Sequence, residues 1–338
     1  MLTVVDQAAT HHLNFDPAQD FTAEYFHLTP NFPFGTALWL GQRHQAGGSD
    51  FLGNGTSSDV LFRNDASGDT WFEAMSNGAS AGWNQIGGSD THYSAVGLGE
   101  FFGIATSDIL YRNASTGDTW IYGAFAGWNQ IGGSDTQYSA AGVGDFFGDG
   151  TNDILFRNNT SGDTWFEGIS AGAFNGWYQI GGSNTQYGVV GVGDFYGNGI
   201  SDILFRNSST GDTWIETISN GAVNGWRQVG GSDTHYSVVG VGDFDGNGFS
   251  DILFRNNSTG DTWFEAISNG LFNGWHPVGG SDTHYAVVGI GDYFNTGTSD
   301  ILFRNNSTGD TWFEAMSNGA SAGWNQVGGS NTSYSVKT

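Results

Sequence analysis

Short apolar runs alternate with polar, glycine-rich segments along almost the whole chain. Residues 284–329 show the pattern clearly, because HYAVVGIG is a continuous apolar run and ILFRN, TWFEAMS and GWNQVGG follow it, separated by Gly, Asn, Ser and Thr. Runs of this length between turn residues are typical of β-strands. Gly and Asn interrupt every window, so no segment keeps the apolar spacing of a helix. We therefore predict an all-β chain, with strands in this stretch at 284–291, 301–305, 311–317 and 323–329.

The same pattern recurs, and the arginine of LFRN or LYRN marks each copy. The markers are 49, 45, 49, 49 and 49 residues apart. Six copies with a period of about 40–50 residues, each with short strands, are typical of propeller blades rather than helical solenoids. The NSTGD segment between the second and third strands predicts a tight hairpin turn, in which Gly309 takes a positive φ. The marker residues are Arg63, Arg112, Arg157, Arg206, Arg255 and Arg304.

The two ends of the chain do not fit the six repeats. Residues 1–36 match no repeat, whereas ALWLGQ at 37–42 aligns with AVGLGE at 95–100, and residues 332–338 begin a further copy. Because 338 residues divided by seven give about 48, we predict a seven-bladed β-propeller of four-stranded blades. Strands from both termini, such as LTVVD, EYFHL and the C-terminal strand, would close the last blade. The alternative is six blades with an N-terminal arm; 1–36 is then a divergent segment and 37–338 the repeat region of one domain.

Twelve of the thirteen tryptophans occupy two repeated positions. One set closes the GDTW hairpin and the other begins the fourth strand. Such residues are either platforms on which sugars stack or packing between adjacent blades, and the sequence leaves both interpretations open. The hairpin set is Trp71, Trp120, Trp165, Trp214, Trp263 and Trp312, and the fourth-strand set is Trp83, Trp128, Trp177, Trp226, Trp275 and Trp324.

The charge of the chain is strongly acidic, since 9 Lys and Arg against 34 Asp and Glu give a net charge of −25. A surface of this sign repels nucleic acid and anionic lipid, and it attracts divalent cations. No apolar run approaches the ~18 residues needed to cross a bilayer, so we expect no membrane insertion. The chain has no cysteine, and residues 1–20 lack the basic and apolar regions of an ordinary signal peptide.

One segment, GDFDGNGFSD at 242–251, has the spacing of a cation-binding loop. Counted from Asp243, oxygen-bearing side chains stand at the first, third, fifth and ninth positions, and Gly248 stands at the sixth. Alternate residues of such a loop converge on one point, as the oxygen ligands of calcium do. A plain turn of Asp, Asn and Gly is the simpler interpretation. The predicted ligands are Asp243, Asp245, Asn247 and Asp251.

With its loop, strand and period, GDFDGNGFSDILFRN resembles the FG-GAP/VCBS-type repeat of integrin α-chain propellers and of many bacterial surface and secreted proteins. The resemblance covers residues 37–338. It implies a propeller, typically of seven blades, in which the loop calcium is structural. It also implies an adhesion or ligand-binding role; some members of the family are lectins, and some are appended to enzymes.

The other copies of the loop depart from the full set of oxygen ligands. The third position is Phe102, Phe147, Tyr196 or Phe294 in four of them. We therefore predict one complete site, two sites with fewer ligands and three loops without metal, in which the closing aspartate caps the turn or pairs with an arginine. The two sites with fewer ligands consist of Asp145, Asp149 and Asp153 in one loop and Asp194, Asn198 and Asp202 in the other.

The repeated arginine lies within an apolar strand. It either binds a carboxylate ligand or is buried in a pair with an acidic side chain of an adjoining turn, such as Asp108 or Asp118. Because an unpaired buried charge is very costly, we predict the structural pair.

A binding surface is expected where the repeats differ. The residue after the fourth-strand tryptophan varies between blades, although drift at an exposed position would look the same. The candidate ligand-binding residues are Tyr178, Arg227 and His276, together with Trp177, Trp226 and Trp275.

The sequence contains no Ser–His–Asp order, nucleophile elbow, HExxH or phosphate loop, so we predict that the chain is not an enzyme. The predicted function is that of a calcium-stabilised, exported propeller, monomeric and lectin- or adhesin-like, that binds glycans or cell-surface ligands at several equivalent sites. We expect it outside the cell or on the cell surface. The alternative is a structural or protein-interaction scaffold from a larger adhesin or enzyme, without ligand chemistry of its own.

Overall fold

The computed structural model of the chain divides into two units, Met1–His44 and Gln45–Thr338. The first unit contains two antiparallel hairpins, in which β1 (Leu2–Val5) pairs with β2 (Thr10–Leu13) and β3 (Glu24–Asn31) pairs with β4 (Gly35–Gln42). The structure describes residues 2–5, 10–13, 24–31, 35–42, 49–55, 57–87, 90–132, 135–181, 184–230, 233–279, 282–328 and 331–338.

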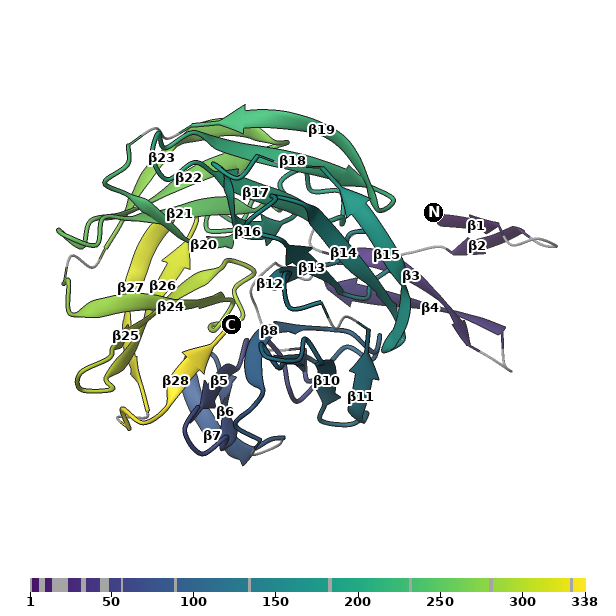
Figure 1. The fold of residues 1–338 in the computed structure, drawn as a ribbon, viewed down its shortest axis with the longest axis horizontal. Helices are drawn as coiled ribbons and strands as arrows, with labels where there is room; N and C mark the ends of the chain where they lie inside the picture. The colour runs from purple at the N-terminus through teal and green to yellow at the C-terminus, as the bar shows by residue number, and fades with distance from the viewer. Residues whose placement is uncertain are drawn as a thin grey trace. The chain divides into compact units, whose positions relative to one another are not determined.

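The second unit is a ring of six four-stranded antiparallel sheets, which we number as blades I to VI (Figure 1). From the centre outward, blade I consists of β28 (Ser335–Lys337), β5 (Val60–Arg63), β6 (Thr70–Ser76) and β7 (Ala79–Gln85). Blade II consists of β8 (Ser94–Gly99), β9 (Asp108–Arg112), β10 (Thr119–Gly123) and β11 (Gly127–Ile131). Blade III consists of β12 (Ser139–Gly144), β13 (Asp153–Arg157), β14 (Thr164–Ser170) and β15 (Ala173–Ile180).

The remaining three blades repeat this order. Blade IV consists of β16 (Gly188–Gly193), β17 (Asp202–Arg206), β18 (Thr213–Ser219) and β19 (Ala222–Val229). Blade V consists of β20 (Ser237–Gly242), β21 (Asp251–Arg255), β22 (Thr262–Ser268) and β23 (Leu271–Val278). Blade VI consists of β24 (Tyr285–Gly291), β25 (Asp300–Asn305), β26 (Thr311–Ser317) and β27 (Ala320–Val327).

The prediction of seven blades is wrong, because the ring closes with six. The C-terminal strand β28 pairs with β5 and is therefore the innermost strand of blade I, not of an additional blade. The segment 37–42, which resembles an inner strand in sequence, belongs to β4 and pairs with β3 in the first unit. The inner strands contact one another in turn, and β28 contacts both β24 and β8, so each of the six repeats completes one blade.

The strand and turn assignments within a repeat are largely confirmed. In blade VI the third strand is Thr311–Ser317 as predicted, and Gly309 has a φ of 80° in the turn before it. The fourth strand starts earlier than predicted, at Ala320, because Asn318 and Gly319 alone form the connection. Their φ values of 48° and 76° are those of a two-residue hairpin turn with both central residues left-handed.

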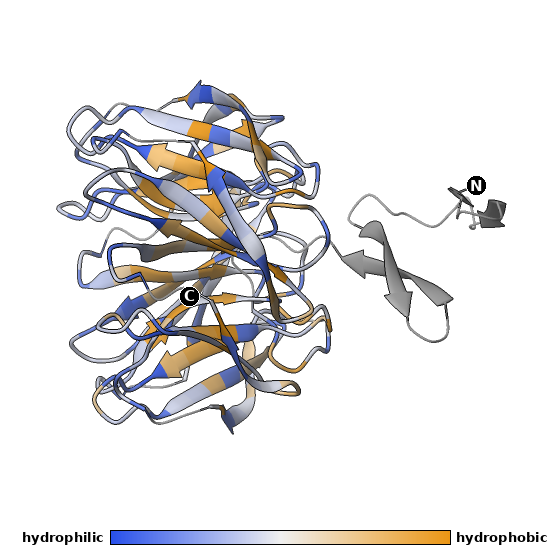
Figure 2. Cartoon of the chain, turned by 45° about the vertical axis from the view of Figure 1, so that its right-hand side comes forward, coloured by the Kyte–Doolittle hydropathy of each residue, from blue (hydrophilic) through white to orange (hydrophobic). Residues whose placement is uncertain are grey.

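The core of the propeller lies in the seams, by which we mean the interfaces between consecutive blades. One cluster joins Phe195 and Leu204 of blade IV to Ile252 and Phe254 of blade V, and five similar clusters join the other neighbouring pairs. Figure 2 shows the apolar residues concentrated in the strands inside the ring. No helix among the described residues has the length and apolarity that crossing a membrane requires.

Candidate functional site

The loop between β20 and β21 gathers three carboxylates around one point. Asp243, Asp245 and Asp251 each place an oxygen within 4.8 Å of the others, and they form the only such acidic group found in the part of the chain that the structure describes. Burial raises the pKa of Asp243 to about 6, and burial together with the charge of Asp245 raises that of Asp251 to about 9. Three crowded carboxylates in a partly buried loop favour a cation between them.

The donor set of this loop suits a hard cation, although most of its oxygens also hold the backbone. Asp251 accepts hydrogen bonds from the N–H groups of Phe244 (2.9 Å) and Ile267 (2.8 Å). Asp243 accepts bonds from Gly246 and Gly248, at 2.7 and 2.8 Å. A carboxylate oxygen has lone pairs for both an N–H donor and a metal. The three carboxylates therefore fit calcium, with the side-chain carbonyl of Asn247, which accepts a bond from Phe249 N–H, as the fourth predicted ligand.

The other predicted ligands bind backbone N–H groups of their own loops and blades. Asp145 binds the N–H groups of Gly148 and Gly150, and Asp149 binds that of Thr151. The same holds in blade IV, where Asp194 accepts bonds from Asn198 and Gly199, and Asn198 accepts one from Ile200. The closing residues Asp153 and Asp202 each bind two backbone N–H groups. Calcium binding at these two loops stays a prediction.

The aromatic side chains at the third loop position have a structural role that the sequence did not reveal. Each one covers the hairpin glycine of the next blade, so closely that a Cβ atom on this glycine would collide with the ring. The N–H group of the same glycine donates to the carbonyl of the second loop position, as from Gly270 to Phe195 at 2.8 Å. Asp245 occupies this place beside Gly319 in blade V. The covered pairs are Phe102 with Gly172, Phe147 with Gly221, Tyr196 with Gly270, and Phe294 with Gly78.

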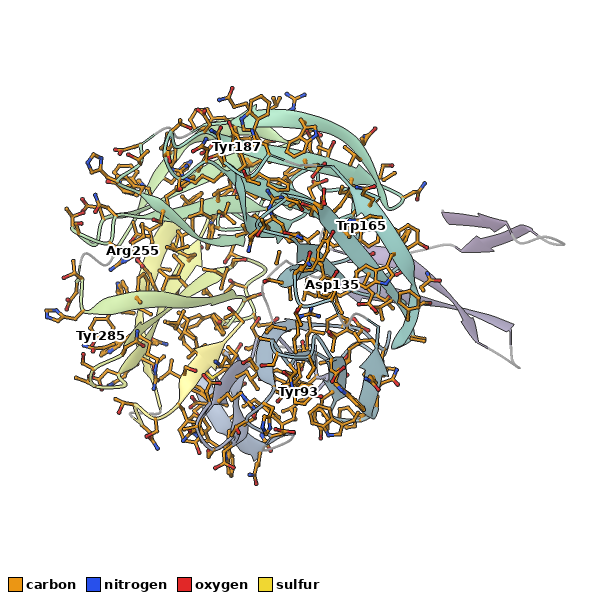
Figure 3. All side chains as sticks on the ribbon, viewed as in Figure 1. Tyr93, Asp135, Trp165, Tyr187, Arg255 and Tyr285 are labelled. Carbon is orange, nitrogen blue, oxygen red and sulfur yellow. The ribbon has the colours of Figure 1, made fainter. Side chains whose placement is uncertain are left out.

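The repeated arginine is structural, but at Arg112 backbone carbonyls and the Thr119 hydroxyl (2.7 Å), rather than the predicted carboxylates, receive its hydrogen bonds. Arg112 donates from Nη1 to Gly117 O (3.0 Å) and from Nη2 to Asp135 O (2.8 Å) and Tyr138 O (2.9 Å). Arg255 likewise donates from Nη2 to the carbonyl of Tyr285 (3.0 Å), and both residues are labelled in Figure 3. Asp118 acts on Arg112 only through its charge.

Each arginine also lies over an aromatic ring of the following blade. The guanidinium carbon of Arg112 is 4.9 Å from the ring centre of Phe156, and such a contact is favourable because of the ring quadrupole. Six of these contacts run round the ring, so they connect every blade to the next. The remaining pairs are Arg63 with Tyr111, Arg157 with Phe205, Arg206 with Phe254, Arg255 with Phe303, and Arg304 with Phe62.

The fourth-strand tryptophans, which we call the rim tryptophans, both pack and remain accessible. Their exposed fractions are 39–46%. Each rim indole rests against the second-strand aromatic of its own blade, as Trp226 does on Phe205 with ring centres 5.2 Å apart. Cζ2 of Trp226 also approaches Gly181 at the end of the preceding blade. The rim tryptophans are Trp83, Trp128, Trp177, Trp226, Trp275 and Trp324.

The structure separates the two sets of candidate ligand-binding residues. Alternate residues of a strand point to opposite faces, so Tyr178, Arg227 and His276 lie on the other face from the tryptophans that precede them. Tyr178 stacks on Phe166, with ring centres 5.0 Å apart, and His276 stacks on Phe264 at 4.8 Å. Arg227 donates from Nε to the hydroxyl of Tyr196 (3.1 Å). These three side chains thus take part in packing within their own blades.

The third strand contains a buried acid in five of the six blades, which sequence reasoning missed. Glu73, Glu167, Glu216, Glu265 and Glu314 have relative exposures of 0% and are the register partners of rim tryptophans. The sequence signal is an acidic residue that follows Trp and an apolar residue in TWFEAMS and its copies, near the middle of a strand that is otherwise uncharged.

No protein-family model matches the chain, and no curated protein matches its sequence. Similar solved structures include a protein of unknown function from Bacteroides caccae, which is 8% identical with a TM-score of 0.42, over 80% of this chain and 94% of that one. Dihydro-heme d1 dehydrogenase NirN in complex with DHE is 10% identical, with a TM-score of 0.42, over 79% of this chain and 53% of that one. Virginiamycin B lyase from Staphylococcus aureus is 11% identical, with a TM-score of 0.41, over 84% and 92%.

These likenesses concern the fold alone. The prediction that the chain is not an enzyme is withdrawn, since two of the similar structures are named as a dehydrogenase and a lyase, but at TM-scores of 0.41–0.42 nothing of their activity is carried over to this chain.

Proposed function

We propose that the chain is a binding module that recognises carbohydrate, or a glycan-bearing cell surface, through several equivalent sites. The observation that supports this proposal is the set of rim tryptophans, which are half-exposed at the same place in all six blades. An indole held against a buried aromatic ring offers its free face to the apolar side of a sugar. Several weak sites on one rigid ring give useful avidity for a surface that displays many copies of a glycan.

Two further elements of the proposal rest on the resemblance to FG-GAP/VCBS-type repeats and on the loop of blade V. Asp243, Asp245 and Asp251, with Asn247, would hold a structural calcium ion, which cancels the repulsion among their charges. A calcium-stabilised module of this kind suits a location outside the cell or on its surface. The propeller would act there as a monomer, and its net charge of −25 makes nucleic acid an unfavourable partner.

A glycan array probed with the purified chain tests this proposal. We expect several glycans to bind, and we expect the triple variant Trp177→Ala, Trp226→Ala, Trp275→Ala to lose at least about tenfold in avidity because half of the platforms are gone. Leu52→Ala is the matched control, since Leu52 is also an exposed apolar side chain, with 42% exposure, but lies in a loop of blade I.

The control experiments also separate the competing interpretations. Loss of binding in Arg227→Ala or His276→Ala, with the tryptophan variants unaffected, would move the site to the opposite face of the fourth strands. An array without any bound glycan, for a chain that is folded and monomeric, would favour the structural or protein-interaction scaffold instead.

A further inference from the structure

Five seams of the propeller contain a glutamate that is fully buried and incompletely hydrogen-bonded. At least one carboxylate oxygen of each of these side chains has no hydrogen-bond partner. Burial of a carboxylate without full compensation is costly, and the cost disappears when the group binds a proton. Neither the proposed calcium site nor the proposed rim platforms use these groups. The five residues are Glu73, Glu167, Glu216, Glu265 and Glu314.

The seam between blades IV and V shows the arrangement in detail. Oε1 of Glu265 accepts a hydrogen bond from Gly230 N–H of the preceding blade (2.6 Å), and Oε2 has no partner. A Cβ atom at Gly230 would lie 2.8 Å from Oε1, so a larger residue there would force the carboxylate to move. Glu265 is the register partner of Trp275 on the neighbouring strand, and these two side chains therefore lie side by side.

The charged groups that face these glutamates are few. Arginine from the preceding blade acts on four of them, namely Arg112 on Glu167, Arg157 on Glu216, Arg206 on Glu265, and Arg255 on Glu314. Ser80 and Gly328 face Glu73, and Ser321 also faces Glu314. The attraction by arginine does not offset burial, which raises the pKa of Glu167, Glu216 and Glu265 to about 7 and that of the other two above its usual range.

The seam between blades I and II is a natural control. Tyr122 stands there in place of the glutamate, and its ring contacts the rim residue Trp128 with centres 4.7 Å apart. Arg63, the arginine of this seam, lies 3.6 Å from Asp65 of its own blade, an acid that the equivalent position of other repeats lacks. This seam thus keeps the arginine and the rim tryptophan but has no buried glutamate.

We propose that the five seam glutamates make the propeller proton-sensitive: its blades close most firmly at mildly acidic pH, and the five seams weaken together as the glutamates ionise above neutral pH. The direction follows from linkage, since a carboxyl that binds protons more tightly in the folded state stabilises that state at low pH and loses this effect as pH rises through its folded pKa. With an unfolded pKa of 4.5 and folded pKa values of about 7, the stability changes between about pH 4.5 and pH 7. The inference does not depend on what the rim binds.

Selective labelling of glutamate tests the proposal directly, because the chain has only seven glutamates and five of them are in seams. In a chain labelled with ¹³C at glutamate Cδ, we expect three of the carboxyl signals, those of Glu167, Glu216 and Glu265, to titrate between pH 6 and 8. Glu216→Gln and Glu265→Gln should each remove one of these signals and so assign them. Seven carboxyl signals that all titrate below pH 5 in the folded chain would overturn the proposal.

Denaturant unfolding at several pH values provides the second measurement. Each proton taken up on folding changes the unfolding equilibrium constant about tenfold per pH unit. Between pH 5 and 7, the unfolding equilibrium constant of Glu216→Gln should therefore change about tenfold less per pH unit than that of the wild-type chain. Asp261→Asn, a substitution in an exposed turn, should leave this pH dependence unchanged. Equal slopes for the wild-type chain and Glu216→Gln would contradict the proposal, and the labelling experiment decides the question if that variant does not fold.

Discussion

The closing aspartates of the loops in blades V and VI make the same hydrogen bonds, although the two loops differ at five of their nine positions, the third among them. Asp251 holds Phe244 N–H and Ile267 N–H at 2.9 and 2.8 Å, and Asp300 holds Tyr293 N–H and Met316 N–H at 2.9 and 2.8 Å. At the third position, however, blade V has Asp245, whereas blade VI has Phe294 against Gly78 of blade I.

This comparison separates two roles that the calcium-loop motif combines. The closing aspartate is needed to join loop, second strand and third strand, so every blade retains it whether or not a cation is bound. The third position faces the neighbouring blade, and an aromatic ring there packs the seam without a metal. A loop can thus lack an acidic residue at the third position and still keep the blade intact, because an aromatic ring packs the seam at the same position.

Removal of the closing aspartate from the loop without metal should have the largest effect. Asp300→Ala leaves the N–H groups of Tyr293 and Met316 buried without acceptors, and we expect a loss of about 3–5 kcal/mol in the free energy of unfolding. Denaturant unfolding with and without calcium checks this, and the loss should be the same in both conditions. A loss below about 1 kcal/mol would show that the aspartate does not hold the blade.

The second-largest loss of stability should follow removal of calcium from the loop of blade V. The size of this loss should depend on pH. A cation that binds only the folded chain stabilises it by about 2.7 kcal/mol at a hundredfold excess over Kd. Because the pKa of Asp251 is about 9 without the ion, binding at neutral pH displaces a proton, and affinity should rise about tenfold per pH unit up to that value. Without calcium the sign is reversed: the raised pKa stabilises the fold below about pH 4 and this contribution is lost as pH rises through 9.

Melting curves at pH 6, 7 and 8, with calcium and with EDTA, measure this dependence. The separation between the two curves should widen as the pH increases. Curves that coincide at all three pH values, for protein loaded with calcium beforehand, would exclude a stabilising ion at Asp243, Asp245 and Asp251.

The sequence predicts the features that neighbouring residues determine, and it misses the contacts between segments that lie far apart along the chain. The repeat, the strands of each blade and the turn at Gly309 follow from neighbouring residues, and all were predictable. The number of blades was not, because the pairing of β28 with β5 joins the two ends of the propeller unit and no local pattern records it. The same reason explains the carbonyl partners of the repeated arginine and the pairing of Phe294 with Gly78, since each contact depends on a segment far along the chain.

Replacement of the third-position residue, Asp245, by Phe would make the loop of blade V resemble the loops of the neighbouring blades. Asp245→Phe removes one carboxylate of the cluster and places a ring beside Gly319, as Tyr196 stands beside Gly270. We expect the calcium response to disappear, while the stability of the calcium-free chain stays within about 1 kcal/mol of the wild type or rises, because repulsion with Asp251 is relieved. Calorimetry with EDTA measures both quantities, and Asp245→Ala, which lacks the packing ring, is the matched control.

The smallest effect is expected at Asp261, an acid of the same blade that belongs to the hairpin and not to the loop. Its side chain is exposed and accepts a hydrogen bond from Thr259 Oγ1 (2.9 Å), so it serves the turn between β21 and β22. Asp261→Ala should change the free energy of unfolding by at most about 0.5 kcal/mol, as surface substitutions usually do. The calcium response should be retained in full, because this carboxylate lies outside the cluster at Asp243, Asp245 and Asp251. If Asp261→Ala reduced the response as much as Asp245→Phe does, the stabilisation by calcium would reflect general screening of the acidic surface, and the distinction between blade V and its neighbours would fail.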